Sequence, residues 1–488
     1  MLHINNIQNI SEMKELFAVS AKGSEMLIDV CGRFFTKNIT RQLTFVKSKG
    51  FKASEIILVL LHLPFLGVAT VRGLIKSGCA RLSEAEKDVY YRLKNNPAIN
   101  WRSLLMSFAK RFNKLSVEHG EASQDAIKCF IIDDSDYHKT GKKIEFIGKI
   151  FDHVSHRWVL GFKLLTLGFW DGASFNPLDF SLHNEKGKNK KQPYGLKKSE
   201  LKKRFSKERP ADSAGAKRAR ELSEKKNENA IKMIKRAVKN GFLADYVLAD
   251  SWFISQFFIV SIRKIKENAM HVLGMCKMDK RKYVYCGQEV TAKQLLSMFK
   301  KRKKRSRKIN ASYIELEVKY KGTPVKLFFS RYSHRGKWHL LLTTDLNLNF
   351  NKAIEIYGKR WSIEVFFKDC KQYLNLGKCQ ANDFDAQIAD TTISMMQYIA
   401  LNLKRRFQAY ESIGELFREQ KSILLESTIV ERLWGLFLAL LRKIVELFEI
   451  DIEHILQKFF TQADFEQKIV KILRSLETQN DQGFNYAA

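Results

Sequence analysis

Apolar residues recur at helical spacing through the first quarter of the chain. The stretch 39–63 has this period, with turn signals at Gly50 and Ser54, and the stretches 83–96 and 101–115 repeat it. We therefore expect residues 1–125 to form an all-helical domain. A basic face bearing Arg41, Lys47, Lys49 and Lys52 favours docking on duplex DNA, although a plain helical bundle has the same period.

The pattern changes at Ala126 to short apolar runs, which are typical of buried strands. Such runs occupy 126–134, 144–154, 158–172, 245–250 and 271–278, with a helix predicted over 253–267. A strand-rich segment follows, and helical spacing returns from about residue 385. These patterns predict an α/β core over 126–380, a β-rich insertion at about 275–346, and a helical C-terminal region over 381–488.

Charge narrows the class of partner. The chain of 488 residues has 85 Lys and Arg against 52 Asp and Glu, a net charge of +33. An excess of this size favours a polyanionic partner, and nucleic acid fits a large globular chain better than a membrane surface does. Charge alone is also compatible with a ribosome-associated or simply basic protein.

Two segments concentrate this charge. Residues 184–239 are basic and polar, and their last part is predicted to be a helix that ends at Gly241, while the first part is a solvated insertion or a DNA-contacting arm. Residues 300–308 are basic at every position except Ser306, which predicts a mobile segment that grips nucleic acid or a solvated loop.

Cysteine usage and hydropathy favour a cytoplasmic protein. The seven cysteines are scattered without a Cys-x-x-Cys pair, so neither a disulfide framework nor a zinc knuckle is predicted. The N-terminal residues have no signal-peptide pattern, and the longest apolar run, 56–71, is too short to cross a bilayer. We expect a cytoplasmic protein without a membrane partner.

Three acids are candidates for chemistry because of their positions. Asp133 is predicted to end the first core strand, Asp250 ends another strand, and Glu364 lies in a predicted helix. Strands that end in carboxylates bring acids to one edge of a sheet, where hard oxygen ligands suit Mg²⁺ or Mn²⁺. Two such ions can activate a nucleophile and stabilise the leaving oxygen of a phosphodiester. Taken singly, each acid is compatible with a cap or turn residue.

The residues around Glu364 strengthen this interpretation. At about 100° per residue, a continuous helix would bring Tyr357, Arg360, Glu364, Lys368 and Lys371 into one stripe. A stripe with one acid and three bases suits a metal ligand beside a phosphate backbone. A salt-bridged solvent face is the alternative, because Arg360 and Glu364 are spaced i,i+4.

The spacing Tyr357-x2-Arg360-x3-Glu364-x6-Lys371 resembles the Y-R-E-K signature of a large group of bacterial insertion-sequence transposases. The Asp-x-Ser at 133–135 and LADSWF at 248–253 resemble the motifs of that family's first and second aspartates. The resemblance covers roughly residues 126–380. Asp134 adjoins Asp133 and is an alternative first ligand.

The resemblance implies a ribonuclease-H-like catalytic core with a β-rich insertion, flanked by helical domains. It implies a DDE transposase in which Asp133, Asp250 and Glu364 hold two Mg²⁺ ions, with Mn²⁺ as a substitute. Arg360 and Lys371 would hold phosphates, and Tyr357 would position the strand. Trp338, which precedes an apolar strand of the insertion, would stack in the space left by a flipped base during hairpin formation.

Partners follow from the same resemblance. It implies binding to terminal inverted repeats and target DNA, and a bacterial protein associated with the nucleoid. It also implies a homodimer in the synaptic complex, with the apolar residues 434–441 as a candidate interface and a buried core helix as the alternative. Two rival functions remain: a metal-dependent nuclease without strand transfer, and a non-catalytic DNA-binding protein derived from a transposase.

Overall fold

The computed structural model describes residues 27–425, except 48, 77–84, 119–125, 188, 266, 268 and 408–409. These residues belong to one compact unit, residues 25–421, apart from the last few. The apolar segment at 434–441 lies outside the described residues, so the proposed dimer interface is not examined by the structure. Among the described residues, no helix combines the length and apolar character needed to cross a membrane.

The N-terminal part is helical, as the apolar spacing predicted. Its helices are α2 (Leu27–Gly32), α3 (Lys37–Val46), α4 (Ala53–His62), α5 (Val71–Lys76), α6 (Lys87–Lys94) and α7 (Trp101–Glu118). Some of them pack on one another, α4 on α2 and α3, and α5 on α6. Helices α2, α4, α6 and α7 pack on the long helix α15 (Phe384–Phe407), and α7 also packs on the sheet. The apolar faces of these early helices are therefore covered by a late one.

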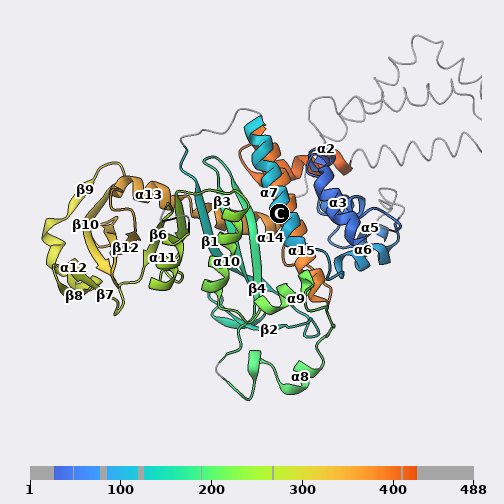
Figure 1. Ribbon diagram of the computed structural model, residues 1–488, viewed down its shortest axis with the longest axis horizontal. Helices are drawn as coiled ribbons and strands as arrows, with labels where there is room; N and C mark the ends of the chain where they lie inside the picture. Colours follow the sequence, from blue (N-terminus) through green and yellow to red (C-terminus); the bar gives the residue numbers. More distant parts are fainter. Residues whose placement is uncertain are drawn as a thin grey trace, which may run out of the picture. The chain divides into compact units, whose positions relative to one another are not determined.

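The centre of the chain forms a mixed sheet (Figure 1). Its first strands are β1 (Cys129–His138), β2 (Gly148–Asp152), β3 (Arg157–Trp170), β4 (Phe175–His183), β5 (Tyr246–Ala249) and β6 (His271–Cys276). Strand β3 pairs antiparallel with β1, β2 and β4, whereas β1, β5 and β6 are parallel neighbours. This mixed order, with helices packed on the sheet, is consistent with the expected α/β nuclease core.

Four helices connect strands β4, β5 and β6. They are α8 (Lys198–Lys202), α9 (Ala214–Glu221), α10 (Lys226–Lys239) and α11 (Gln256–Arg263), and a short 3₁₀ turn, η3 (Pro193–Gly195), precedes α8. The basic polar segment thus contains α9 and α10, and α10 ends before Gly241 as expected. Helix α11 is shorter at both ends than the predicted helix over 253–267.

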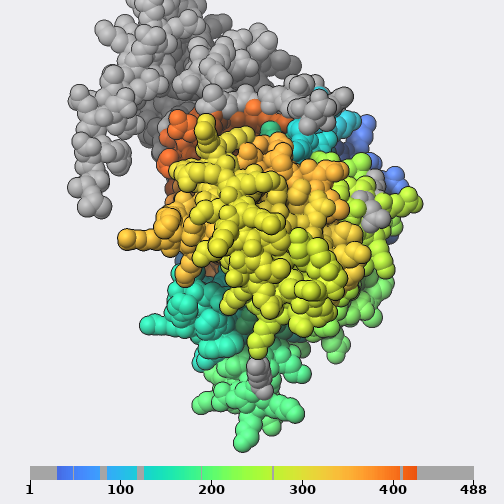
Figure 2. Space-filling view, turned by 90° about the vertical axis from the view of Figure 1, so that its left-hand side faces the viewer, coloured from blue at the N-terminus to red at the C-terminus, as the bar shows by residue number. Residues whose placement is uncertain are grey.

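The β-rich insertion continues the core sheet. Its elements are β7 (Lys282–Tyr285), β8 (Gln288–Thr291), α12 (Ala292–Phe299), η4 (Lys300–Arg302), β9 (Lys304–Ser306), β10 (Ala311–Tyr320), β11 (Thr323–Arg331) and β12 (His339–Thr343). Strand β12 pairs with β6, so the sheet runs on through β11, β10, β7 and β8. Figure 2 shows this insertion, in yellow, forming one continuous surface on the side viewed.

The basic run at 300–308 is more ordered than a mobile or solvated loop would be. Residues 304–306 form β9, which pairs with β10. Ser306 is buried and its hydroxyl donates a hydrogen bond of 2.6 Å to the side-chain oxygen of Asn351. The one uncharged position of the run therefore anchors it, while its basic side chains stay exposed.

Candidate active site

Asp133 and Asp250 are neighbours across two parallel strands. Strands β1 and β5 pair with Ile132 opposite Ala249, and each of these two residues is followed by an aspartate. The prediction that Asp133 ends its strand was wrong. Strand β1 continues to His138, because its other neighbour β3 supplies partners to that point, and only β5 ends at Ala249.

Glu364 reaches this position from the two helices that follow the insertion. These are α13 (Phe350–Gly358) and α14 (Trp361–Tyr373), which are separate elements and not the one continuous helix predicted. Between them, the amide of Arg360 donates to the carbonyl of Tyr357 and that of Ile363 to the carbonyl of Arg360, as in a 3₁₀ turn. Because this turn is short, Tyr357 and Arg360 still lie together, with the guanidinium 5.8 Å from the centre of the Tyr357 ring.

Arg360 joins two of the three acids. Its Nη1 donates a hydrogen bond of 2.7 Å to Oδ2 of Asp133, and its Nη2 donates to Oε1 of Glu364. The side chains of Asp133 and Arg360 are mostly buried, at 16 % and 17 % exposure. Asp250 lies close enough for its charge to act on Asp133, and its own Oδ1 accepts from the amide of Trp252 at 2.8 Å.

The electrostatic balance of the site is unfavourable to a fully ionised Asp133. Burial raises the pKa of Asp133 to about 7, the guanidinium of Arg360 opposes that rise, and the charge of Asp250 adds to it. The three carboxylates are hard oxygen donors, and a single guanidinium bridges two of them. A divalent cation bound between them would offset their negative charge. These residues therefore fit a divalent metal site.

Lys371 and Tyr357 extend the site along the same face. Lys371 donates a hydrogen bond of 2.8 Å to Oγ of Ser135, two residues beyond Asp133 on β1. Burial lowers the pKa of Lys371 from its usual value, and the charge of Asp136 partly opposes this change. Burial raises the pKa of Tyr357 to about 12, against the effect of Arg360. Lys368, which the continuous helix put in the same stripe, is exposed.

Asp134 points away from this group. Alternation along β1 puts Asp133 and Asp134 on opposite faces of the sheet. Oδ2 of Asp134 accepts a hydrogen bond of 2.7 Å from Lys226, at the start of α10. Nζ of Lys226 also lies 4.5 Å from the centre of the half-exposed Trp252 ring. This Asp134–Lys226–Trp252 contact was not predicted from the sequence, although Trp252 belongs to the LADSWF motif.

Trp338 lies at the same edge of the sheet as the acids but not in contact with them. Strand register puts Met275 level with Asp250, and Leu341 level with Met275. Strand β12 is two strands from β5, and Trp338 precedes Leu341 by three residues, so the Trp338 backbone is roughly 14 Å from that of Asp250. The guanidinium of Arg331 lies 5.0 Å from the centre of its ring.

A second group of possible metal ligands occurs farther along β1. Oxygen and nitrogen atoms of Asp136, His138 and Asp152 lie within 4.8 Å of one another. Protein donors already occupy both carboxylates: Lys163 pairs with Asp136, and Oγ of Ser155 donates to Asp152 at 2.8 Å. Four hydrogen bonds reach the three carboxylates of Asp133, Asp250 and Glu364, whereas four reach the two carboxylates of Asp136 and Asp152. Because each acid of the first group has fewer protein donors, we favour that group as the metal ligands.

Comparison with known families agrees with this chemistry. A transposase DDE domain model matches residues 221–403, which contain Asp250 and Glu364. A DDE superfamily endonuclease model matches residues 84–274, which contain Asp133 and Asp250. No curated protein matches the chain significantly. The two family matches together span residues 84–403, and this region is therefore similar to DDE-superfamily transposases and endonucleases.

Proposed function

We propose that the protein is a cut-and-paste transposase of the Y-R-E-K group, which cleaves DNA at the ends of a mobile element and joins them to target DNA. One observation carries the proposal. Asp133 and Asp250 lie side by side at the end of β5. Arg360, at the start of α14, donates hydrogen bonds to both Asp133 and Glu364 and so links these two acids. Separate parts of the chain thus supply three acids to one site, within the region that matches the DDE families.

Asp133, Asp250 and Glu364 would hold two divalent ions, Mg²⁺ or Mn²⁺. Nucleases of the DDE type use divalent metals, and such ions lower the pKa of a bound water or hydroxyl and stabilise the leaving oxygen. The chain's own residues bind and orient the DNA. Arg360 and Lys371 supply positive charge on the same face of β1 as Asp133, where a scissile phosphate would lie.

Tyr357 and Trp338 would hold the DNA strand in its reactive conformation. The Tyr357 ring packs beside Arg360, so it can position the strand next to the acids. Trp338 lies at the same sheet edge, roughly two to four nucleotide spacings away, where its ring can stack in the place of a flipped base. That flip would let a free 3′-hydroxyl attack the opposite strand and form a hairpin.

The experiment is a cleavage assay on a plasmid that carries the coding sequence with its native flanking DNA, in the presence of Mg²⁺ or Mn²⁺. We expect the wild type to cut at the element ends and to produce joined products with a second plasmid. Glu364→Gln should abolish cutting. Glu355→Gln is the matched control, because Glu355 lies on the neighbouring helix α13 in an exposed ion pair with Lys352.

The products separate the possible functions. Cutting without joined products would favour the nuclease, which the endonuclease family match also supports. Binding to the flanking DNA without any cutting, by wild type and Glu364→Gln alike, would favour a non-catalytic DNA-binding protein. Hairpin ends that are lost in Trp338→Ala but kept in Trp158→Ala, a change at an exposed tryptophan of β3, would support the role of Trp338.

A further inference from the structure

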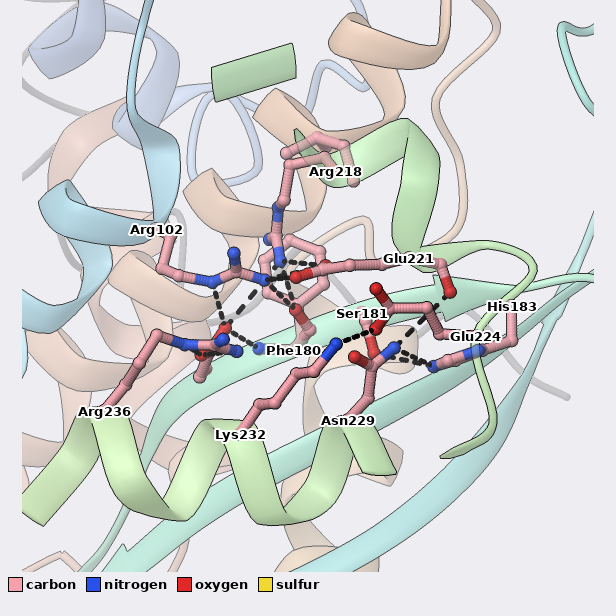
Figure 3. Close-up of polar contacts among 12 residues, drawn as sticks. Arg102, Phe180, Ser181, His183, Arg218, Glu221, Glu224, Asn229, Lys232 and Arg236 are labelled. Carbon is pink, nitrogen blue, oxygen red and sulfur yellow. Dashed lines mark hydrogen bonds and ion pairs between the residues drawn. The ribbon is translucent and has the colours of Figure 1, made fainter. Parts of the chain in front are cut away.

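A cavity of about 970 Å³ lies apart from the three acids. Its walls come from the N-terminal ends of α7 and α9, from α10 and from the start of α15, none of which carries Asp133, Asp250 or Glu364. Figure 3 shows the polar side chains that converge there from α7, α9 and α10, above β4. Six basic side chains line this cavity: Arg102, Lys217, Arg218, Arg220, Lys232 and Arg236.

Two carboxylates hold the arginines of this cavity: Glu221, which lines it, and Asp179, which is not part of the lining. Asp179, whose side chain is fully buried, accepts from Nε of Arg102 at 2.8 Å and pairs with Nη2 of Arg236 at 2.7 Å. Both oxygens of Glu221 accept from Nη2 of Arg102 at 2.8 Å. Among these residues, two carboxylates therefore face three guanidinium groups, because Arg218 is also present. The other three acids of the lining, Asp212, Glu224 and Asp385, stand against three more bases, Lys217, Arg220 and Lys232, so the cavity keeps one excess positive charge.

Arg218 pairs with the same two carboxylates at longer range, its Nη1 lying 3.4 Å from Oε2 of Glu221 and 3.7 Å from Oδ1 of Asp179. Only 5 % of Arg218 is exposed, its Nη1 donates to the carbonyl of Phe180, and its guanidinium lies 4.2 Å from the centre of the Phe180 ring. Its Nε and Nη2 are buried and have no hydrogen-bond partner within the part of the chain that the structure describes. Buried donors without partners are costly, and on a cationic group they are best satisfied by an anion.

The electrostatics of the cavity also favour an anion. Burial lowers the pKa of Arg218 to about 9, and the positive charge of Arg102 contributes to this shift. The N-terminal ends of α7 and α9 lie at the cavity, where Asn100 caps α7 and Ser213 caps α9. The free amide groups and dipoles of helix N-termini attract anions. Lys217 and Arg220 on α9 are exposed and lie within reach of solvent.

We propose that this cavity binds a phosphate group, with Arg218 as its inner positive charge and Lys217 and Arg220 as its outer contacts. The phosphate belongs either to a DNA backbone or to a small phosphorylated molecule. The first source would add a DNA contact away from the cleavage site. The second would make the cavity a ligand site in its own right. The buried donors and the cationic excess do not depend on the proposed function.

The first experiment measures the binding of inorganic phosphate to the full chain by isothermal titration calorimetry, with a chelator present and chloride holding the ionic strength constant. We expect saturable binding to the wild type, and a dissociation constant raised about tenfold or more in Arg218→Met, as for the loss of charged hydrogen bonds. Lys142→Gln is the control, because Lys142 pairs with Glu200 on the surface outside this cavity. It should leave the dissociation constant unchanged.

A second variant guards against misfolding, because Arg218 also holds the Phe180 carbonyl. Lys217→Gln combined with Arg220→Gln removes two exposed charges and leaves Arg218 in place, and it should weaken phosphate binding at an unchanged melting temperature. Absence of saturable phosphate binding to the wild type would overturn the proposal. Equal affinity in all variants would overturn it as well.

The second experiment separates the two sources of phosphate. Binding of duplex DNA is measured in the same chelator, where no cleavage can occur. Weaker DNA binding by the Lys217 and Arg220 double variant, together with competition by inorganic phosphate, would assign the cavity to the DNA backbone. Unchanged DNA affinity with intact phosphate binding would assign it to a small ligand. Both readouts are independent of cleavage, so a failure of the proposed transposase activity leaves this test valid.

Discussion

Asp133 and Asp134 are adjacent in the sequence but have different surroundings. Asp133 shares a face of β1 with Ser135 and contacts Arg360, whereas Asp134 contacts Lys226 on the opposite face. The sequence left both as possible ligands, since a motif match gives the spacing of acids along the chain but not the face of the strand. Only the pairing of β1 with β5 and α14 distinguishes the two.

This difference predicts opposite outcomes for two similar changes. Asp133→Asn should lower the rate of DNA cleavage by more than about 100-fold. Loss of a residue that only hydrogen-bonds to a metal ligand costs about 10- to 100-fold, and loss of the ligand itself costs more. Asp134→Asn should keep the rate within about threefold and cost about 1 kcal/mol of stability, through the lost pair with Lys226. Gel assays of initial rates, with urea unfolding as the stability measurement, compare the two. A reversed order of activity would assign the ligand to Asp134.

The bridge made by Arg360 yields a prediction about metal-dependent stability. In Arg360→Gln the carboxylates of Asp133 and Glu364 lose their shared cation, so without metal they repel each other. A divalent ion then replaces the lost charge. We expect Mn²⁺ to raise the melting temperature of Arg360→Gln more than that of the wild type, although the variant cleaves DNA poorly. A smaller shift in the variant would mean that Arg360 supports metal binding.

The raised pKa of Asp133 sets the pH dependence of metal binding. In the metal-free protein this carboxyl is protonated below about pH 7, and metal binding must expel the proton. The affinity for Mn²⁺ should therefore fall by about tenfold for each pH unit below 7 and level off above it. Calorimetric titrations at several pH values measure this slope. A flat profile would show that Asp133 is ionised throughout or does not bind the ion.

At the scale of elements, the sequence predicted strands and helices better than their ends. Strands β5 and β6 coincide with short apolar runs of the sequence. Strands β7, β10, β11 and β12 coincide with the apolar runs of the insertion. The break between α13 and α14 was not predictable from the period, because the residues around Arg360 keep helical spacing. Order in the basic run was hidden for a different reason. A single buried serine, which bonds to the distant Asn351, and pairing with β10 hold it, and neither appears in local charge.

A loop with one buried basic side chain, that of Arg209, ties α15 to the core. Arg209 pairs with Glu145 at 2.6 Å and with Asp385 at 3.0 Å, and all three side chains are at most 5 % exposed. Arg209→Met would leave two buried carboxylates without this partner, at a cost of about 3–5 kcal/mol. The exposed pair Lys282–Glu289 offers the control, since Lys282→Met should cost at most about 1 kcal/mol. Urea unfolding of both variants tests the contrast, and equal losses would contradict it.

At the scale of the molecule, the insertion and the N-terminal helices are built into the catalytic unit. The insertion continues the core sheet through β6 and β12. The N-terminal helices cover α15, and Arg102 of α7 pairs with the fully buried Asp179 of β4. The sequence predicted the helical character of residues 1–125, but local spacing says nothing about which distant element a helix packs on.

This packing predicts that the catalytic region does not fold without the N-terminal helices. A fragment of residues 126–425 would expose the apolar face of α15 and leave Asp179 and Asp390 without Arg102 and Lys94. We expect the fragment to aggregate, or to melt at least about 10 °C below the full chain, as the loss of several kcal/mol implies. Circular dichroism and limited proteolysis compare them. A fragment of full-length stability would show that residues 1–125 are an independent domain.

The position of α15 also has a consequence for synthesis on the ribosome. Lys94 and its partner Asp390 are 296 residues apart in the chain. At a translation rate of about 5–20 residues per second, the early helices wait roughly 15–60 s before the helix that covers them exists. During that interval their apolar faces are available to chaperones or to other nascent chains. Each polypeptide therefore cannot complete this packing until α15 has been made.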